Sequence, residues 1–425
     1  MKLLLKNMRI AETAVSDYEV SDVLIENGVI SKVATSISCD ADRVIDGEGK
    51  LFVAPGLVDM HVHFRDPGFT YKEDVLTGAQ AAKAGGVTTV CCMPNTKPTI
   101  DNAETVSYII NKAKGTGVKV YPVGSITKGL SGKELCDYDE LKASGVIAIS
   151  DDGRPVENAE YMRKALEMSN DNGLCVISHC EDLNIINGGI INKGKVSEKL
   201  GVKGMDRASE DYITAREIAL AMSCDARIHI AHVSTKGSVN IIRAAKKDGV
   251  KVTCETCPHY FTYTDEKLLS RDADYRMSPP LREEDDRIAV EQAVIDGTID
   301  CIVTDHAPHS AEDKADFLTA PNGVVGLETS LAVTLTQLYH TGKLSMSEII
   351  NRMAVRPREI LGLEGVSVKE GSIADLTVFD ADYEWIVEPQ KLSSKSKNSV
   401  FKGEKLKGRA IYTITDGNIV FELND

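Results

Sequence analysis

The chain has 425 residues, of which 42% are hydrophobic and 27% are charged, as in an ordinary soluble globular protein. This length predicts two or three domains, or a single α/β barrel of about 250 residues with a smaller domain. Its 49 Lys and Arg residues against 64 Asp and Glu give a formal net charge of −15, and no apolar run reaches a membrane-spanning length, so we expect no nucleic-acid or membrane partner.

Both ends of the chain carry short strand patterns separated by turn signals. Asn27-Gly28 separates two such runs near the start, and Asp416-Gly417 separates two more near the end. Neither end has enough strands to close a core alone. We therefore expect residues 1–54 and 366–425 to form one small composite β-sandwich domain.

The middle of the chain alternates β-branched runs with amphipathic segments of helical length. Alternating β and α units predict parallel strands, and eight of them predict a closed (β/α)8 barrel of the TIM type, placed at residues 55–365. An open doubly wound sheet is disfavoured because no Gly-x-Gly-x-x-Gly turn follows the first strand. The eight expected strands are Leu57–His63, Val87–Met93, Val118–Gly124, Val146–Ser150, Leu174–His179, Arg227–Val233, Val250–Glu255 and Asp300–Asp305.

Functional side chains of such a barrel lie at the carboxyl ends of its strands. His61 and His63 are two residues apart on one strand, so both side chains point to the same face. Imidazoles and carboxylates converging from several strands predict a divalent-metal site, most often zinc. Five of the nine histidines in the chain fall at expected strand ends, with three aspartates beside them: His61, His63, His179, His232, His309, Asp151, Asp152 and Asp305.

The remaining strand-end histidines receive structural interpretations. His229 lies three residues before His232, so strand alternation predicts that it faces the surrounding helices. His306 is expected to point away from the barrel opening, and the role of His259 stays open. The polar, acidic segment 310–320 follows His309 and has the composition of a mobile lid rather than packed structure.

Two segments of the chain resemble the signature motifs of the dihydroorotase family, within the amidohydrolase superfamily. Other segments resemble further blocks of that family in the family's order, so the resemblance covers nearly the whole chain. It is strongest to the bacterial metal-dependent class, called class I. The signature segments are Asp59–Arg65 and Thr304–His309, and the other blocks are Met93–Thr96, Ser150–Gly153, Ser178–Glu181, Ala231–Thr235 and Pro279–Arg282.

The resemblance implies a centre of one or two zinc ions. It places His61, His63 and Asp305 on one ion, and His179 with His232 on the other. Many amidohydrolases bridge two metals with a carboxylated lysine after the fourth strand; this chain has no lysine there, and the resemblance implies Asp152 instead. The substrate-binding residues that it implies are His63, Arg65, Asn95, Ser278, His309, Asn322 and Gly323.

For function, the resemblance implies a cyclic amide hydrolase. The expected reaction is the reversible cyclisation of N-carbamoyl-L-aspartate to L-dihydroorotate and water, in de novo pyrimidine (UMP) biosynthesis. Asp305 is the expected catalytic residue, which takes a proton from the attacking water and passes it to the leaving ring nitrogen. The partner is then a small-molecule substrate, with a homodimer or other pyrimidine-pathway enzymes as further partners, in the cytoplasm.

Two departures and two alternatives accompany this interpretation. Ser278 stands where the family usually carries asparagine, and Asn322 replaces a common aromatic residue. A related cyclic amidohydrolase, of the allantoinase or hydantoinase type, is the first alternative; Arg65, Asn95 and the missing lysine disfavour it. The second alternative is a non-catalytic scaffold subunit related to dihydroorotase, which is disfavoured because no metal-ligand position is missing.

Overall fold

The computed structural model describes residues 2–12 and 20–424, and eight strands in the middle of the chain run parallel in chain order. They pair in two groups, of three and five strands, and the bridges Gly124–Ile149 and Val62–His306 join the groups into a closed ring. The expected (β/α)8 barrel is confirmed. Its strands are β6 (Leu57–Val62), β7 (Val87–Cys92), β8 (Lys119–Pro122), β9 (Ala148–Ile149), β10 (Cys175–Ser178), β13 (Ile228–Ile230), β14 (Val252–Thr256) and β15 (Cys301–Ile302).

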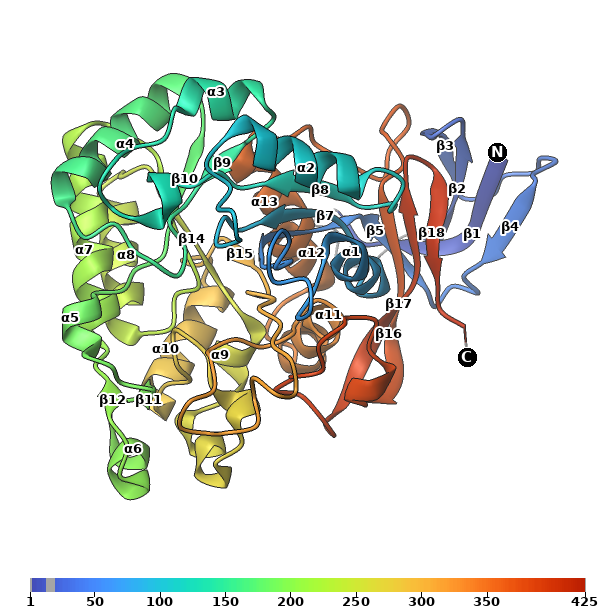
Figure 1. Cartoon of the computed structure of the whole chain (residues 1–425). Helices are drawn as coiled ribbons and strands as arrows, with labels where there is room; N and C mark the ends of the chain where they lie inside the picture. Colours follow the sequence, from blue (N-terminus) through green and yellow to red (C-terminus); the bar gives the residue numbers. More distant parts are fainter. Residues whose placement is uncertain (1, 13–19, 425) are drawn as a thin grey trace.

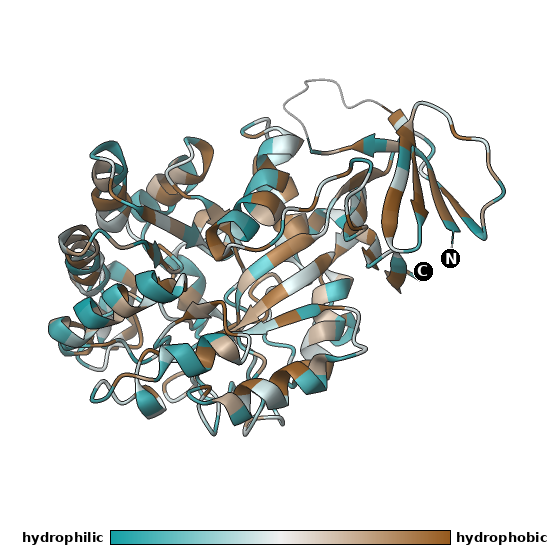
Figure 2. Ribbon diagram, turned by 90° about the horizontal axis from the view of Figure 1, so that it is seen from above, coloured by the Kyte–Doolittle hydropathy of each residue, from teal (hydrophilic) through white to brown (hydrophobic). Residues whose placement is uncertain are grey.

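Helices follow every barrel strand and surround the barrel (Figure 1). Figure 2 shows hydrophobic residues along the strands and many hydrophilic residues on the surrounding helices, as burial of apolar surface requires. None of the helices among the described residues is long and apolar enough to cross a membrane. The α-helices are α1 (Val75–Ala84), α2 (Ala103–Ala113), α3 (Tyr138–Ala143), α4 (Ala159–Asn172), α5 (Leu183–Ile186), α6 (Lys195–Leu200), α7 (Ala208–Ser223), α8 (Lys236–Lys247), α9 (Pro258–Thr262), α10 (Glu284–Ile295), α11 (Ser330–Thr334), α12 (Met346–Ile350) and α13 (Arg356–Leu361).

Local sequence explains where these helices begin and end. The Asn158 side chain caps α4 by accepting from the first-turn amides, and Gly173 ends the helix with a φ of 64°. The shorter elements around the barrel are β11 (Ile191–Asn192), β12 (Gly204–Met205), the 3-10 turns η1 (Lys128–Leu130), η2 (Asp265–Ser270), η3 (Ala273–Tyr275) and η6 (Pro389–Lys391), and the π-helical turns η4 (Leu335–Tyr339) and η5 (Asn351–Val355).

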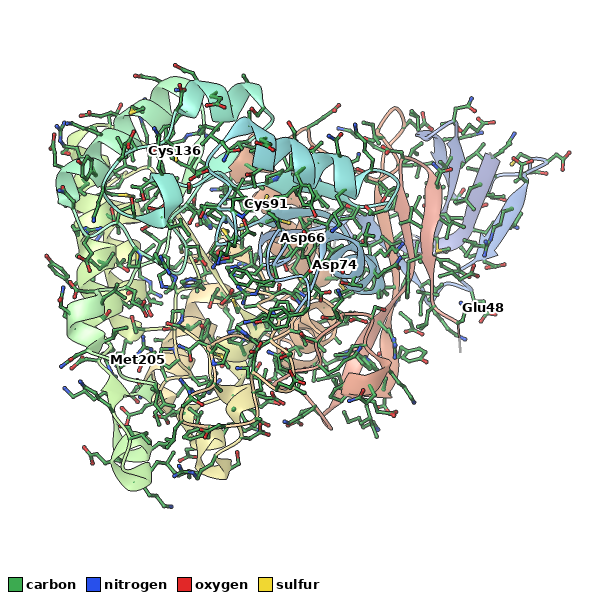
Figure 3. The ribbon with its side chains drawn as sticks, viewed as in Figure 1. Glu48, Asp66, Asp74, Cys91, Cys136 and Met205 are labelled. Atoms are coloured by element: carbon green, nitrogen blue, oxygen red, sulfur yellow. The ribbon has the colours of Figure 1, made fainter. Side chains whose placement is uncertain are left out.

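The two ends of the chain meet in one eight-stranded sheet beside the barrel (Figure 1). The N-terminal strand β5 pairs with the C-terminal strand β16, and apolar residues of both chain ends share one core. Glu48 lies at this end of the molecule and Met205 at the opposite end in Figure 3. The domain boundaries given above stay a prediction. The strands are β1 (Lys2–Ile10), β2 (Val20–Glu26), β3 (Val29–Ala34), β4 (Arg43–Asp46), β5 (Phe52–Pro55), β16 (Leu376–Ile386), β17 (Lys405–Thr415) and β18 (Asn418–Glu422).

Candidate metal centre and active site

The carboxyl ends of the barrel strands bring together the six side chains that the sequence predicts as metal ligands. They are all buried, and five of them line a cavity of about 360 Å³, the exception being His61, which lies deeper in the barrel. The substrate-binding candidates line the same cavity. Those residues are His63, Arg65, Asn95, Ser278, His309, Asn322 and Gly323.

Asp152 lies at the centre of this cluster. It belongs to two overlapping groups of potential ligands, one with His61 and His63 and one with His179 and His232, and the ligand atoms within each group lie within 4.8 Å of one another. Tetrahedral zinc with bonds of about 2.0–2.1 Å places neighbouring ligand atoms about 3.4 Å apart. The distances from imidazole nitrogens to the Asp152 oxygens are 3.4 Å for His61, 3.3 Å for His63, 3.3 Å for His179 and 3.5 Å for His232.

Hydrogen bonds behind the cluster orient the first two histidines. His61 Nδ1 lies 2.6 Å from Glu255 Oε1, and His63 Nδ1 lies 2.8 Å from Asn95 Oδ1. Each Nδ1–H donates to an oxygen, so each Nε2 lone pair faces the cluster. Within the described residues, His61 Nε2 and Asp152 Oδ1 have no hydrogen-bond partner although both are buried. A buried nitrogen and a buried oxygen that have lone pairs but no hydrogen-bond partner are suited to bind a metal ion.

The charges around the cluster favour a cation. Burial alone would lower the pKa of His179, but Asp152 and Glu181 outweigh it and raise that pKa to about 10. Burial would likewise raise the pKa of Asp152, yet the surrounding imidazoles, His61 foremost, hold it well below its usual range. The carboxylates therefore stabilise positive charge at these nitrogens, and a divalent ion supplies that charge without protonating them. Asp305 adds a further carboxylate, 3.1 Å from His63 Nε2.

Three residues of the site have left-handed backbone conformations. The φ angles are 59° for Arg65, 31° for His232 and 48° for Asp305, which L-residues with a Cβ rarely adopt. Each residue lies just beyond the end of its barrel strand, so the left-handed turn breaks the strand's alternation of side-chain directions. The strain is of the kind that clusters at functional sites.

Arg65 and His309 line the same cavity as five of the six predicted metal ligands, and the six are called here the metal-type cluster: His61, His63, Asp152, His179, His232 and Asp305. Arg65 is half-buried, and desolvation lowers its pKa to about 10, which leaves it charged at neutral pH. Burial, followed by the charges of Arg65 and Lys72, lowers the pKa of His309, so its ring is neutral. The ring accepts from Lys72 Nζ at Nδ1, over 3.0 Å, and donates from Nε2 to the Asn322 carbonyl, over 2.8 Å.

Ser278 has a partner that the sequence interpretation did not include. Its hydroxyl donates to Glu181 Oε1 over 2.8 Å, and Glu181 Oε2 lies 3.5 Å from His179 Nε2. Both residues line the cavity. Ser278 therefore holds the Glu181 carboxylate beside the metal-type cluster. Because the Ser278 hydroxyl already donates its hydrogen to Glu181, the serine can only accept a hydrogen bond from a substrate.

The structure corrects the interpretation of His229. Its ring nitrogens contact Thr253 Oγ1 at 2.8 Å and Glu255 Oε2 at 3.1 Å, and Glu255 also holds His61. Glu255 is on β14 and His61 is on β6, with β15 between these two strands, so the Glu255 side chain crosses the inside of the barrel to reach His61. Because His229 contacts the same carboxylate, His229 also points into the barrel, and the prediction that it faces the helices is wrong. The sequence interpretation did not include Glu255, although a single acidic residue within an otherwise uncharged strand could have indicated a functional role. His306 lies outside the cavity lining, as expected.

The segment 310–320 is packed in the structure, unlike the unpacked lid expected for it. Lys314 Nζ donates to the carbonyls of Ala273, Arg276 and Pro321. Phe317 is buried in a small apolar cluster with Leu268. The three hydrogen bonds of Lys314 and the apolar contacts of Phe317 therefore hold this segment beside the cavity. The polar composition of the segment did not predict either set of contacts.

Solved structures with the same fold include cyclic amide hydrolases. The L-hydantoinase (dihydropyrimidinase) from Arthrobacter aurescens has a TM-score of 0.86 and 25% identity, over 100% of this chain and 96% of that one. The dihydropyrimidinase from Brevibacillus agri has a TM-score of 0.86 and 22% identity, over 99% and 95%, and supports the fold alone.

Sequence relatives define the family more closely. The family model described as dihydro-orotase-like matches residues 49–238. A dihydroorotase of Trichlorobacter lovleyi is 51% identical over 99% of both chains, and one of Geobacter metallireducens is 50% identical over 99% of this chain and 100% of its own. With such identity over the whole length, and with the metal-type cluster intact, the chain belongs to the dihydroorotase family.

Proposed function

We propose that this protein catalyses the reversible, zinc-dependent cyclisation of N-carbamoyl-L-aspartate to L-dihydroorotate and water, in pyrimidine biosynthesis. One observation carries the proposal: a single cavity is lined both by a half-buried, charged arginine and by a cluster of imidazoles and carboxylates. Dihydroorotate has the matching parts, a cyclic amide to be hydrolysed and a carboxylate to be bound. The dihydroorotases among the relatives support the same reaction.

His61, His63 and Asp152 would hold one zinc ion, and Asp152, His179 and His232 would hold a second, with Asp305 beside the first. Bound there, a divalent ion lowers the pKa of a water molecule and polarises the amide carbonyl of the ring. Neutral imidazoles and carboxylates are the ligands expected for zinc in a site with an open position.

Asp305 would move the proton in this reaction. Its carboxylate lies 3.1 Å from His63 Nε2 and lines the cavity, so it faces the space in which the ring amide must lie. In hydrolysis it takes a proton from the attacking water. The water oxygen bonds to the carbonyl carbon, the ring C–N bond breaks, and Asp305 delivers the proton to the leaving nitrogen. Cyclisation reverses these steps.

The test compares two ring amides that differ only in the carboxylate. Hydrolysis of dihydroorotate and of dihydrouracil is followed by ultraviolet absorbance on the same zinc-loaded sample. We expect a strong preference for dihydroorotate, because a substrate without the carboxylate leaves the half-buried Arg65 guanidinium without an anionic partner. A preference for dihydrouracil or hydantoin would support a hydantoinase-type enzyme instead, and no activity on any ring would support a scaffold.

Arg65→Ala should raise the KM for dihydroorotate by roughly 10- to 100-fold, because a charge-assisted hydrogen bond is worth about 1.5–3 kcal/mol. Activity on dihydrouracil, which lacks the carboxylate, should change little. Arg154→Ala is the matched control, since Arg154 is an exposed arginine that follows β9 on the same side of the barrel. Equal effects of the two substitutions in steady-state kinetics would assign Arg65 no specific contact.

Ser278→Asn should raise kcat/KM for dihydroorotate about two- to tenfold, the value of one added hydrogen bond of 0.5–1.5 kcal/mol. The asparagine amide can donate to Glu181 as the serine does and present its oxygen to a ring N–H. Ser278→Ala, which removes the bond to Glu181, is the comparison variant. Lower activity of Ser278→Asn would mean that this cavity is shaped around serine.

Assembly and location belong to the same proposal. We place the enzyme in the cytoplasm, as a homodimer or in association with other pyrimidine-pathway enzymes. Analytical ultracentrifugation of the purified protein measures the first of these states, and a monomer at all concentrations tested would exclude the homodimer.

A further inference from the structure

A segment from the chain-end sheet reaches the barrel opening. It connects β16 to β17, and within it Asn398 has only 4% of its surface exposed. Its side chain uses both ends: Oδ1 accepts from the His309 backbone N–H over 3.1 Å, and Nδ2 donates to the Gly323 carbonyl over 2.9 Å. Asn398 thus joins two cavity-lining residues that are separated along the chain.

The two joined residues lie in close contact. Gly323 has a φ of 142°, and a Cβ placed there would come within 2.5 Å of the Ala307 carbonyl oxygen and 3.0 Å of His309 Cδ2. A glycine is therefore required where these segments meet. With so little space, the hydrogen bonds of Asn398 hold the His309 and Gly323 backbones together, while Lys72 and the Asn322 carbonyl hold the His309 ring.

Two barrel carboxylates fix the segment that carries Asn398. Glu73, which is fully buried before α1, accepts from Ser394 Oγ over 2.5 Å and from the Lys395 N–H over 3.2 Å. Glu328 accepts from the Ser393 N–H over 2.8 Å and from the Ser394 N–H over 3.0 Å. Charge-assisted bonds of this kind are strong, and they anchor the segment four residues before Asn398.

We infer that Asn398 is a positioning residue for the substrate carboxylate. It holds the His309 and Gly323 backbones in the spacing that keeps the His309 ring beside Arg65, with Nε2 3.3 Å from Arg65 Nη2, and so fixes the side of the cavity where the arginine meets an anionic group. This inference rests on the proposed function, because it takes that wall of the cavity as the carboxylate side. Within the described residues, the hydrogen bonds of Asn398 reach none of the six metal-type groups.

The inference predicts a selective defect in Asn398→Ala. The KM for dihydroorotate should rise at least about fivefold, as expected for two lost hydrogen bonds to buried groups, while kcat and zinc content stay within about twofold of wild type. Ser399→Ala is the matched control: Ser399 is the adjacent, fully buried residue, and in the part of the chain that the structure describes its hydroxyl accepts only from the nearby Phe401 N–H. That control should keep the wild-type KM.

Two further variants keep the test decisive. Asn398→Asp has the same shape and keeps the hydrogen bond from the His309 N–H. It places a carboxylate oxygen against the Gly323 carbonyl oxygen, where the two repel each other, so the KM of this variant for dihydroorotate should also rise. In a His309→Ala background, Asn398→Ala should add much less than it does alone. An unchanged KM in both Asn398 variants, or equal defects in Asn398→Ala and Ser399→Ala, would overturn the inference. Wild-type protein inactive on dihydroorotate would instead overturn the proposed function.

Discussion

Removal of bound metal with a chelator is expected to abolish dihydroorotate hydrolysis, and added Zn²⁺ should restore it. The reason is the buried cluster in which four imidazoles lie within 3.3–3.5 Å of the Asp152 oxygens. Without an ion, the ring amide loses the Lewis acid that this cluster would hold. Metal content by mass spectrometry and activity by ultraviolet absorbance, measured on the same samples, should fall and recover together.

A pair of adjacent aspartates provides the control. Asp152→Asn should lose bound metal and nearly all activity, because its two oxygens serve both ligand groups. Asp151 is also buried, but its Oδ1 accepts from the Ile126 N–H over 2.7 Å and the Thr127 N–H over 3.0 Å, away from the cluster. Asp151→Asn should therefore keep its metal. Full activity in a metal-free sample would reject the metal-dependent reaction.

Asp305→Asn is expected to lower kcat roughly 10²- to 10⁴-fold, the usual contribution of general acid–base catalysis. An amide keeps the shape of the carboxylate but cannot take up the proton. Because Asp152 and the four histidines remain, the variant should retain at least one metal ion. The loss should therefore appear in kcat at saturating metal, unlike the loss in Asp152→Asn.

Steady-state kinetics with parallel metal analysis separates these cases. The Asp151→Asn protein serves again as the control for changing a buried aspartate to asparagine. If Asp305→Asn loses only a few-fold in kcat while it keeps its metal, another group moves the proton. Loss of all metal from Asp305→Asn would make the residue a required ligand and leave its catalytic role undemonstrated.

Strand alternation was sufficient to predict part of the site from the sequence. His61 and His63 occupy alternate positions of one strand, and their Nε2 atoms do face the same carboxylate, Asp152. The eight β-branched runs likewise predicted the closed barrel. Both inferences depend only on local periodicity, which the sequence displays directly.

Alternation failed where the backbone leaves the strand conformation. Counting residues placed His229 and His232 on opposite faces, yet both lie inside the barrel, because His232 follows the end of β13 with a φ of 31°. Tertiary contacts hold this left-handed turn, and no local pattern specifies it.

By itself, the sequence determined the barrel, the meeting of both chain ends in one small β domain, and the convergence of imidazoles and carboxylates at the strand ends. These follow from hydrophobic periodicity and from the fixed direction of parallel strands. Only the tertiary structure decided the partners of the buried polar groups: Glu255 for His61, Glu181 for Ser278, and Asn398 for His309. A buried donor must find an acceptor, but which one it finds depends on contacts between residues far apart in the chain.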